Sequence, residues 1–325
     1  MPGIDVRTSA SRGPGSCQQP GRSTLLGART PWKAGAVEPA QRFERILLAT
    51  DGSDASQAAV ETTIAIAKSL TAKVRVAQVW NLEVRHRHGH WDVEVRGEAG
   101  KLVDATVERL FRAGVLAERE ICRADGEHVG AAIACAAKAF EADLVVIGSR
   151  GLSDWQSLSI HSTSQELLCG LDCPVLIVRA RPIGAAVRTP RIVFAIASGD
   201  DLGKNVRAAV AIAPSETSVM VVHIARAVFS LQGFAHVESS DEIRETISRA
   251  CRLLADGGVP VHGIVAHEGP VAPTVAKIAT DWNADLILVG SSRMGDIGSL
   301  FLGPVSHDLL HGTDRPVLTA ERVRA

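Results

Sequence analysis

The sequence lacks the features that would mark a membrane or nucleic-acid protein. No continuous run of about eighteen apolar residues is present, so a membrane-spanning helix is not expected. Its 35 Lys and Arg residues nearly balance its 36 Asp and Glu residues, for a net charge of -1. No basic field is available to hold a phosphate backbone, and we expect neither a membrane nor nucleic acid as partner.

A disulfide framework and a metal site are also missing. The six cysteines are scattered and mostly lie in apolar segments, which is typical of thiols in a reducing, cytoplasmic setting. Cys169 and Cys173 stand close together, but no second Cys or His pair follows at ligand spacing, so we predict no metal.

The sequence has 325 residues, of which 46% are hydrophobic, and this is enough to form two domains with hydrophobic cores. Residues 1–42 are rich in Gly, Pro, Ser and Arg, with only Asp5 and Glu38 acidic. This composition predicts a disordered extension; a targeting segment and an overextended start are the alternatives.

From Arg45 onward, short apolar runs alternate with longer helical patterns, which predicts crossover units and a mainly parallel sheet. The series then restarts, because Arg191–Ala195 matches Arg45–Ala49 and Pro316–Leu318 matches Pro174–Leu176. We therefore predict tandem α/β domains at 43–180 and 191–325, joined by a linker at 181–190.

One motif occurs in both domains. In the first, the apolar run Asp143–Ile147 leads into Gly148-Ser149-Arg150-Gly151, and nine residues later His161-Ser162-Thr163-Ser164 opens a helical stretch. In the second, Asp285–Val289 leads into Gly290–Arg293, and Gly303-Pro304 follows after nine residues. A strand that ends at glycine and leads to a helix N-terminus suits phosphate oxygens.

This pattern resembles the universal stress protein family in its tandem form, over nearly all of Arg45–Leu318. The resemblance implies an α/β fold of two doubly wound domains, each with an open, mainly parallel five-stranded sheet and helices on both faces. It also implies a stress-response role with adenine-nucleotide binding, and pairing of the two domains through their final strands. ATP, with or without Mg²⁺, is the expected ligand, and other adenine nucleotides remain open, as does a homodimer.

The resemblance assigns the nucleotide site to the first domain. Asp51 follows the first strand, where a carboxylate can accept hydrogen bonds from ribose hydroxyls. Capping the next helix is the other role for Asp51; we favour the ligand role because Ser53 and Asp54 can also cap. The expected binding residues are Ala49, Thr50, Asp51, Val79, Gly148, Arg150, Gly151, His161, Ser162, Thr163 and Ser164.

His161 departs from the family pattern, because it occupies the third glycine position. An imidazole there either obstructs a phosphate or, when protonated, adds charge. The second domain departs further, with Ala197 at the Asp position, Arg293 at the second glycine and Pro304 in place of a hydroxyl. We therefore expect one nucleotide per chain.

Two other segments come close to known motifs. Gly199–Asn205 suggests a P-loop but is one residue short and lacks the final Ser or Thr. The segment His86–His90 is interpreted as a surface loop, with a lid over the nucleotide as the alternative.

No catalytic constellation can be assembled, so we expect a regulatory binding module without efficient catalysis. A slow ATP hydrolase or nucleotidyl transferase, and a ligand-independent interaction module, are the competing functions.

Overall fold

The computed structural model describes residues 24–26, 42–81, 92–124, 129–149, 171, 173–179, 182–183, 190–197, 202–213, 217–225, 227–230, 233–236, 239–268, 270–290, 308–310 and 312–320. The first repeat comprises β2 (Arg45–Ala49), α1 (Asp54–Leu70), β3 (Lys73–Asn81), α2 (Asp92–Arg112), β4 (Ala117–Ala124), α3 (Val129–Phe140), β5 (Leu144–Gly148) and β6 (Val175–Val178). The second comprises β7 (Arg191–Ile196), α6 (Leu202–Ile212), β8 (Ser218–Ala225), α7 (Ser240–Asp256), β11 (Val261–Glu268), α8 (Val271–Asp281), β12 (Leu286–Val289) and β13 (Val317–Thr319).

Each repeat builds the same five-stranded parallel sheet. The order is β4-β3-β2-β5-β6 in the first repeat and β11-β8-β7-β12-β13 in the second. Helices α1, α2, α6 and α7 supply one hydrophobic core, and α3 and α8 supply the core on the other face. The predicted α/β class, with a mostly parallel open sheet and two tandem domains, is confirmed.

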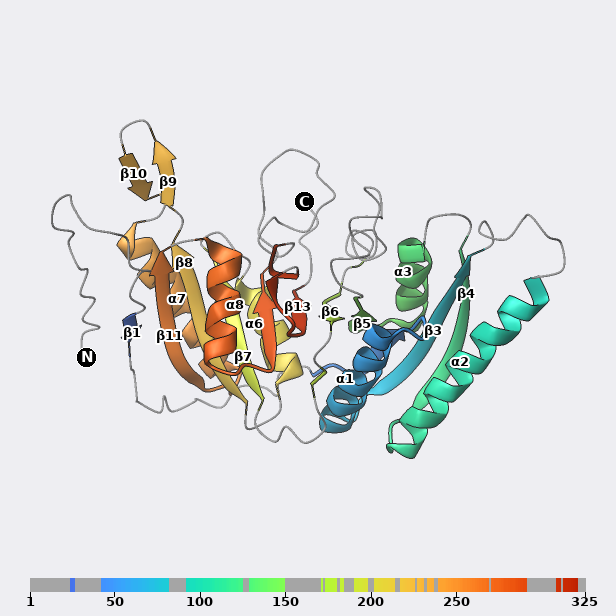
Figure 1. The fold of residues 1–325 in the computed structure, drawn as a ribbon. Helices are drawn as coiled ribbons and strands as arrows, with labels where there is room; N and C mark the ends of the chain where they lie inside the picture. Colours follow the sequence, from blue (N-terminus) through green and yellow to red (C-terminus); the bar gives the residue numbers. More distant parts are fainter. Residues whose placement is uncertain are drawn as a thin grey trace.

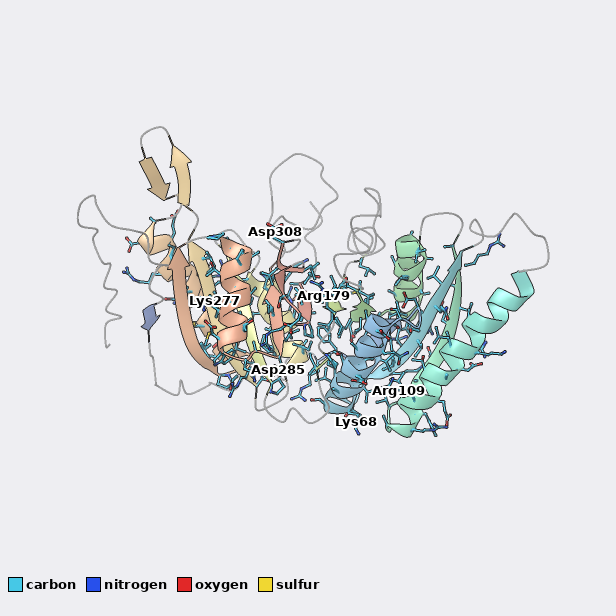
Figure 2. The ribbon with its side chains drawn as sticks, in the orientation of Figure 1. Lys68, Arg109, Arg179, Lys277, Asp285 and Asp308 are labelled. Carbon is cyan, nitrogen blue, oxygen red and sulfur yellow. The ribbon has the colours of Figure 1, made fainter. Side chains whose placement is uncertain are left out.

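The two repeats join edge to edge, because β13 pairs antiparallel with β6 through Val317–Ile177, Leu318–Leu176 and Thr319–Val175. Figure 1 shows the resulting continuous sheet, with β6 and β13 at its middle. Arg179 adds a side-chain link, since its guanidinium donates to the carbonyl oxygens of Leu310 and, at 3.1 Å, Thr313. Figure 2 places Arg179 between the two halves.

The amino ends of the strands are tied down in the same way in both repeats. The Asp143 carboxylate accepts the backbone N–H groups of Glu44 at 2.7 Å and Arg45 at 3.0 Å. Its counterpart Asp285 accepts the N–H of Arg191 at 2.9 Å. Burial raises the pKa of Asp143, and the backbone hydrogen bonds oppose that rise. These acidic residues of the repeated motif therefore serve the architecture.

Two parts of the fold were not expected from the sequence. Within residues 1–42, Thr24–Leu26 form β1, which pairs antiparallel with β11. The prediction of a wholly disordered extension is wrong for these three residues, because the backbone groups at the outer edge of β11 provide partners that a short segment can use without a core of its own. Strands β9 (Ala227–Ser230) and β10 (Gly233–His236) form a separate antiparallel hairpin.

Ile183, within the expected linker, is attached to the first repeat, since its N–H donates to the buried Thr62 hydroxyl at 3.0 Å. Among the described helices, none combines the length and the apolar character needed to cross a bilayer.

Candidate functional site

The candidate site lies where β2 and β5 run side by side in the first repeat. These parallel strands are neighbours in register, with Ala49 opposite Ile147. After β2 the chain forms β3 and β4 on one side of β2. It then crosses over and forms β5 on the other side of β2. Sheets of this order bind ligands at such a switch point, outside the carboxyl ends of the strands. Asp51 and Gly148, two predicted site residues, are both located there.

Asp51 is exposed on a tight turn between β2 and α1. Its Oδ1 accepts hydrogen bonds from the Ser53 N–H at 3.0 Å and the Ser53 hydroxyl at 2.6 Å. Gly52 takes a φ of 80°, which favours glycine, and Leu102 of α2 would lie 3.0 Å from an added Cβ. The N-cap of α1 is Ser53, whose hydroxyl accepts the N–H of Ser56 at 3.3 Å. Asp51 therefore stabilises the turn without being the helix cap.

Thr50 lies beneath this turn, with only 5% of its surface exposed. Its hydroxyl is hydrogen-bonded to the hydroxyl of Ser56, which is 2% exposed in the first turn of α1. The Thr50 N–H donates to the Ala77 carbonyl at 2.9 Å, which fixes the end of β2 against β3. The Thr50 side chain thus supports the turn from inside. Ser56 was not among the predicted site residues.

Gly148 is required by packing. A Cβ on this residue would lie 2.6 Å from the carbonyl group of Ala55 and from the backbone nitrogen of Ser56. The first turn of α1 therefore lies directly against the end of β5. The structure shows the close approach of a helix to this glycine, and the predicted approach of a phosphate stays a prediction. The neighbouring Ser149 N–H donates to the Val178 carbonyl at 2.8 Å.

A partly exposed apolar surface, here called the apolar shelf, lies beside the Asp51 turn on the α3 side of the sheet. It consists of Ala49, Val79, Cys122 and Val129, which all pack on the same core and are not fully covered. Val79 and Cys122 are opposite one another in the β3–β4 register. Burial raises the pKa of the Cys122 thiol to about 11, so this thiol is neutral at physiological pH. The shelf therefore offers an uncharged surface next to an exposed carboxylate.

The described residues of the second repeat differ from the first at this end. Ala197 stands in place of Asp51, and Ile196 and Leu202 stand in place of Thr50 and Ser56. Ile224, the counterpart of Val79, is buried, and so is Ala195, the counterpart of Ala49. At these described positions the second repeat has the apolar residues Ile196, Ala197 and Leu202, where the first has two hydroxyls and a carboxylate.

The other predicted site residues lie outside the described residues. These are Arg150, Gly151, His161, Ser162, Thr163 and Ser164, together with the His86–His90 segment and, in the second repeat, Arg293, Gly303 and Pro304. Within the part of the chain that is described, no group of three or more His, Cys, Asp and Glu side chains is arranged to hold a metal.

Comparison with known proteins agrees with this architecture. Residues 42–179 and 189–320 each match the profile of the Universal stress protein family. A universal stress protein of Bacillus subtilis (strain 168) is 29% identical over 150 residues, covering 42% of this chain and 99% of that protein. One from Thermus aquaticus is 35% identical over 149 residues, with the same shares.

A solved structure extends the match across both repeats. The crystal structure of a universal stress protein from Archaeoglobus fulgidus DSM 4304 aligns with 86% of this chain and 98% of its own, with a TM-score of 0.67. At 19% identity this likeness shows the fold alone. Because the family profile matches twice and covers most of the sequence, the chain belongs to the universal stress protein family, in its tandem form.

Proposed function

We propose that the first repeat binds an adenine nucleotide, and that the chain is a regulatory module of the cytoplasmic stress response. The observation that carries this proposal is the exposed Asp51 carboxylate beside the apolar shelf at the switch point of the sheet. A pocket for a small molecule combines an apolar lining with a few directed polar groups. In this arrangement the ribose hydroxyls donate to Asp51 and the base rests against Ala49 and Val79.

The phosphates would extend from the base toward the segment after β5. This segment begins with Gly148 and Ser149, and the proposal continues it through Arg150, Gly151 and His161–Ser164. Hydroxyls and backbone N–H groups at the start of a helix suit an anion, and Arg150 adds a positive charge. ATP, with or without Mg²⁺ bound to its phosphates, is the proposed ligand.

The cysteines support the cytoplasmic setting. Those within the described residues, Cys122, Cys135, Cys173 and Cys251, are all free thiols. Burial raises the pKa of the Cys251 thiol to about 11, as it does for Cys122, which keeps both neutral and slow to oxidise. The chain is therefore suited to a reducing compartment.

Calorimetric titration with ATP tests the site. Asp51→Ala should raise the dissociation constant at least about tenfold, equivalent to about 1.4 kcal/mol, because the ribose loses an acceptor. Asp54→Ala is the matched control: it removes the same charge from an exposed position in the first turn of α1 and should leave the constant within about twofold. Equal affinities for wild type and Asp51→Ala would refute the assignment.

The stoichiometry tests the restriction to the first repeat. Wild type should bind one nucleotide per chain, since Ala197 provides no carboxylate acceptor and Ile224, the counterpart of Val79, is buried. Ala197→Asp should leave this number at one, because a carboxylate alone does not reopen the covered surface around Ile224. Two equivalent sites in wild type would contradict the proposal.

A further inference from the structure

The Thr50–Ser56 hydroxyl pair is a polar feature buried directly beneath the candidate site. The two hydroxyls are hydrogen-bonded to each other, with Thr50 at the end of β2 and Ser56 in the first turn of α1. The Thr50 hydroxyl also lies 3.4 Å from the Gly52 N–H, for which it is a weak acceptor. One buried hydroxyl therefore contacts both sides of the turn that carries Asp51.

Stability of the fold does not account for this pair. The second repeat places Ile196 and Leu202 at the same two positions, where they are 5% and 3% exposed. Replacing both partners of a buried hydrogen bond with apolar groups is often nearly neutral, because no polar group is left without a partner. The architecture thus tolerates an apolar pair here, and the hydroxyl pair coincides with the repeat that has Asp51 in place of Ala197.

The pair is also linked to the segment after β5. The backbone of Ala55 and Ser56 leaves no space for a Cβ on Gly148, with the nearest atoms 2.6 Å from its position. A shift in the first turn of α1 would therefore be transmitted to the start of the glycine segment. Ser56 lies between the two segments that flank the switch point.

We propose that the Thr50–Ser56 pair is a positioning device that holds the Asp51 turn, and with it the carboxylate, in the geometry that binds the ribose. The inference rests on the proposed nucleotide site and adds Ser56 to it as a positioning residue. Neither hydroxyl needs to contact the ligand. Their effect is exerted through the direction of Asp51.

The test measures ATP affinity and thermal stability of the full chain for Thr50→Val/Ser56→Ala, which removes both hydroxyls together. The dissociation constant should rise about tenfold, because a displaced Asp51 carboxylate loses most of the binding free energy of its contact with the ribose. The melting temperature should stay within about 3 °C of wild type, because no buried partner is orphaned. Thr50→Ile/Ser56→Leu, which copies the second repeat, should show the same loss of affinity and provides a second folded variant.

Two controls separate positioning from a general effect on the helix. Thr63→Val removes a buried hydroxyl of the same helix that donates to the Ala59 carbonyl at 2.8 Å, and it should leave ATP affinity unchanged. Thr50→Ser keeps the hydroxyl and should retain near-wild-type affinity. Equal losses in Thr63→Val and in the double variant would overturn the proposal.

A mutant cycle with Asp51→Ala gives the sharpest outcome. If the pair acts through Asp51, removing both hydroxyls in the Asp51→Ala background should change the dissociation constant by less than about twofold. Full additivity, or unchanged affinity in the double variant while wild type binds ATP, refutes the positioning role and leaves the nucleotide site standing. Absence of ATP binding by wild type refutes the proposed function itself, and the positioning role with it.

Discussion

At the amino ends of their strands the two repeats use the same contacts. Asp143 and Asp285 hold the first residues of β2 and β7, and the guanidinium groups of Arg45 and Arg191 lie 4.7 and 5.9 Å from the rings of Phe140 and Trp282. At the carboxyl ends, Asp51 is replaced by Ala197, and the partly exposed Val79 of the apolar shelf is replaced by the buried Ile224. The contacts that the repeats share maintain the fold, and the differences at the carboxyl ends lie where a ligand is proposed to bind.

The outer edges of the sheet differ as well. On the first repeat, the charged side chain of Arg75 on β3 contacts Glu118 and Glu120 of the edge strand β4. On the second repeat, Met220 is the counterpart of Arg75, and it lies opposite Gly263 on β11. Strand β1 pairs with the outer side of β11. Charged residues and a covering strand are alternative ways to keep an edge from pairing with other chains. The same architecture thus reaches the same protection by two routes.

The largest expected effect tests whether the shared glycine is architectural. Gly148→Ala should lower the free energy of unfolding by about 3 kcal/mol without any nucleotide present, because the added methyl overlaps backbone atoms of α1, which cannot move aside as a side chain can. Thermal and urea unfolding measure the change. Gly97→Ala in α2 is the matched control: no atom lies within 4 Å of its added methyl, so it should be neutral or slightly stabilising. Similar stability for the two variants would show that the contact with α1 does not require glycine at position 148.

The next effect concerns the join between the repeats. Arg179 links β6 to the carbonyls of Leu310 and Thr313, and burial lowers the pKa of its guanidinium, which remains charged. Arg179→Ala should cost about 2 kcal/mol of unfolding free energy, since hydrogen bonds from a charged donor are lost at a partly buried site. Arg112→Ala, which removes an exposed pair with Glu108 on α2, should cost less than about 0.5 kcal/mol. Equal costs would show that the sheet pairing alone holds the repeats together.

The fold was accessible from the sequence because its signals are periodic and occur twice. The matching runs at Arg45 and Arg191 and the alternation of strands with helices predicted the parallel sheet and the tandem division. Strand β1 was not predictable, because three residues carry no periodicity and their pairing depends on an edge supplied by residues far along the chain. The β9–β10 hairpin was missed for a related reason: its strands form a sheet apart from the main one.

The candidate site was less accessible than the fold. Asp51 could be identified from its place after a strand, but Ser56 reads only as one helix position among others. Its hydroxyl reaches Thr50 across the turn between β2 and α1. The one indication in the sequence was that the second repeat has Leu202 at the position of Ser56. The contact of Gly148 with α1 was not predicted, because a glycine in sequence does not indicate that a helix approaches it.

The smallest expected effect is the pH dependence of the stability that Glu118 adds at the charged edge of the first repeat. The hydrogen bond from Lys73 and the contacts of Arg75 lower the pKa of Glu118, against the opposing effect of partial burial. A carboxyl whose pKa is depressed in the folded state adds stability above its unfolded pKa of about 4.3, and this stability is lost as the pH falls through the lower folded value. Glu118→Gln should therefore lower the free energy of unfolding at pH 7 by less than about 1 kcal/mol, because the ion pair is partly solvated. Below about pH 4 the variant should lose less stability with falling pH than wild type does. Arg75→Met, which copies Met220, should also flatten the pH dependence of the unfolding free energy, measured by urea unfolding at each pH. An unchanged pH dependence in both variants would mean that the charges on this edge serve only to prevent pairing with other chains.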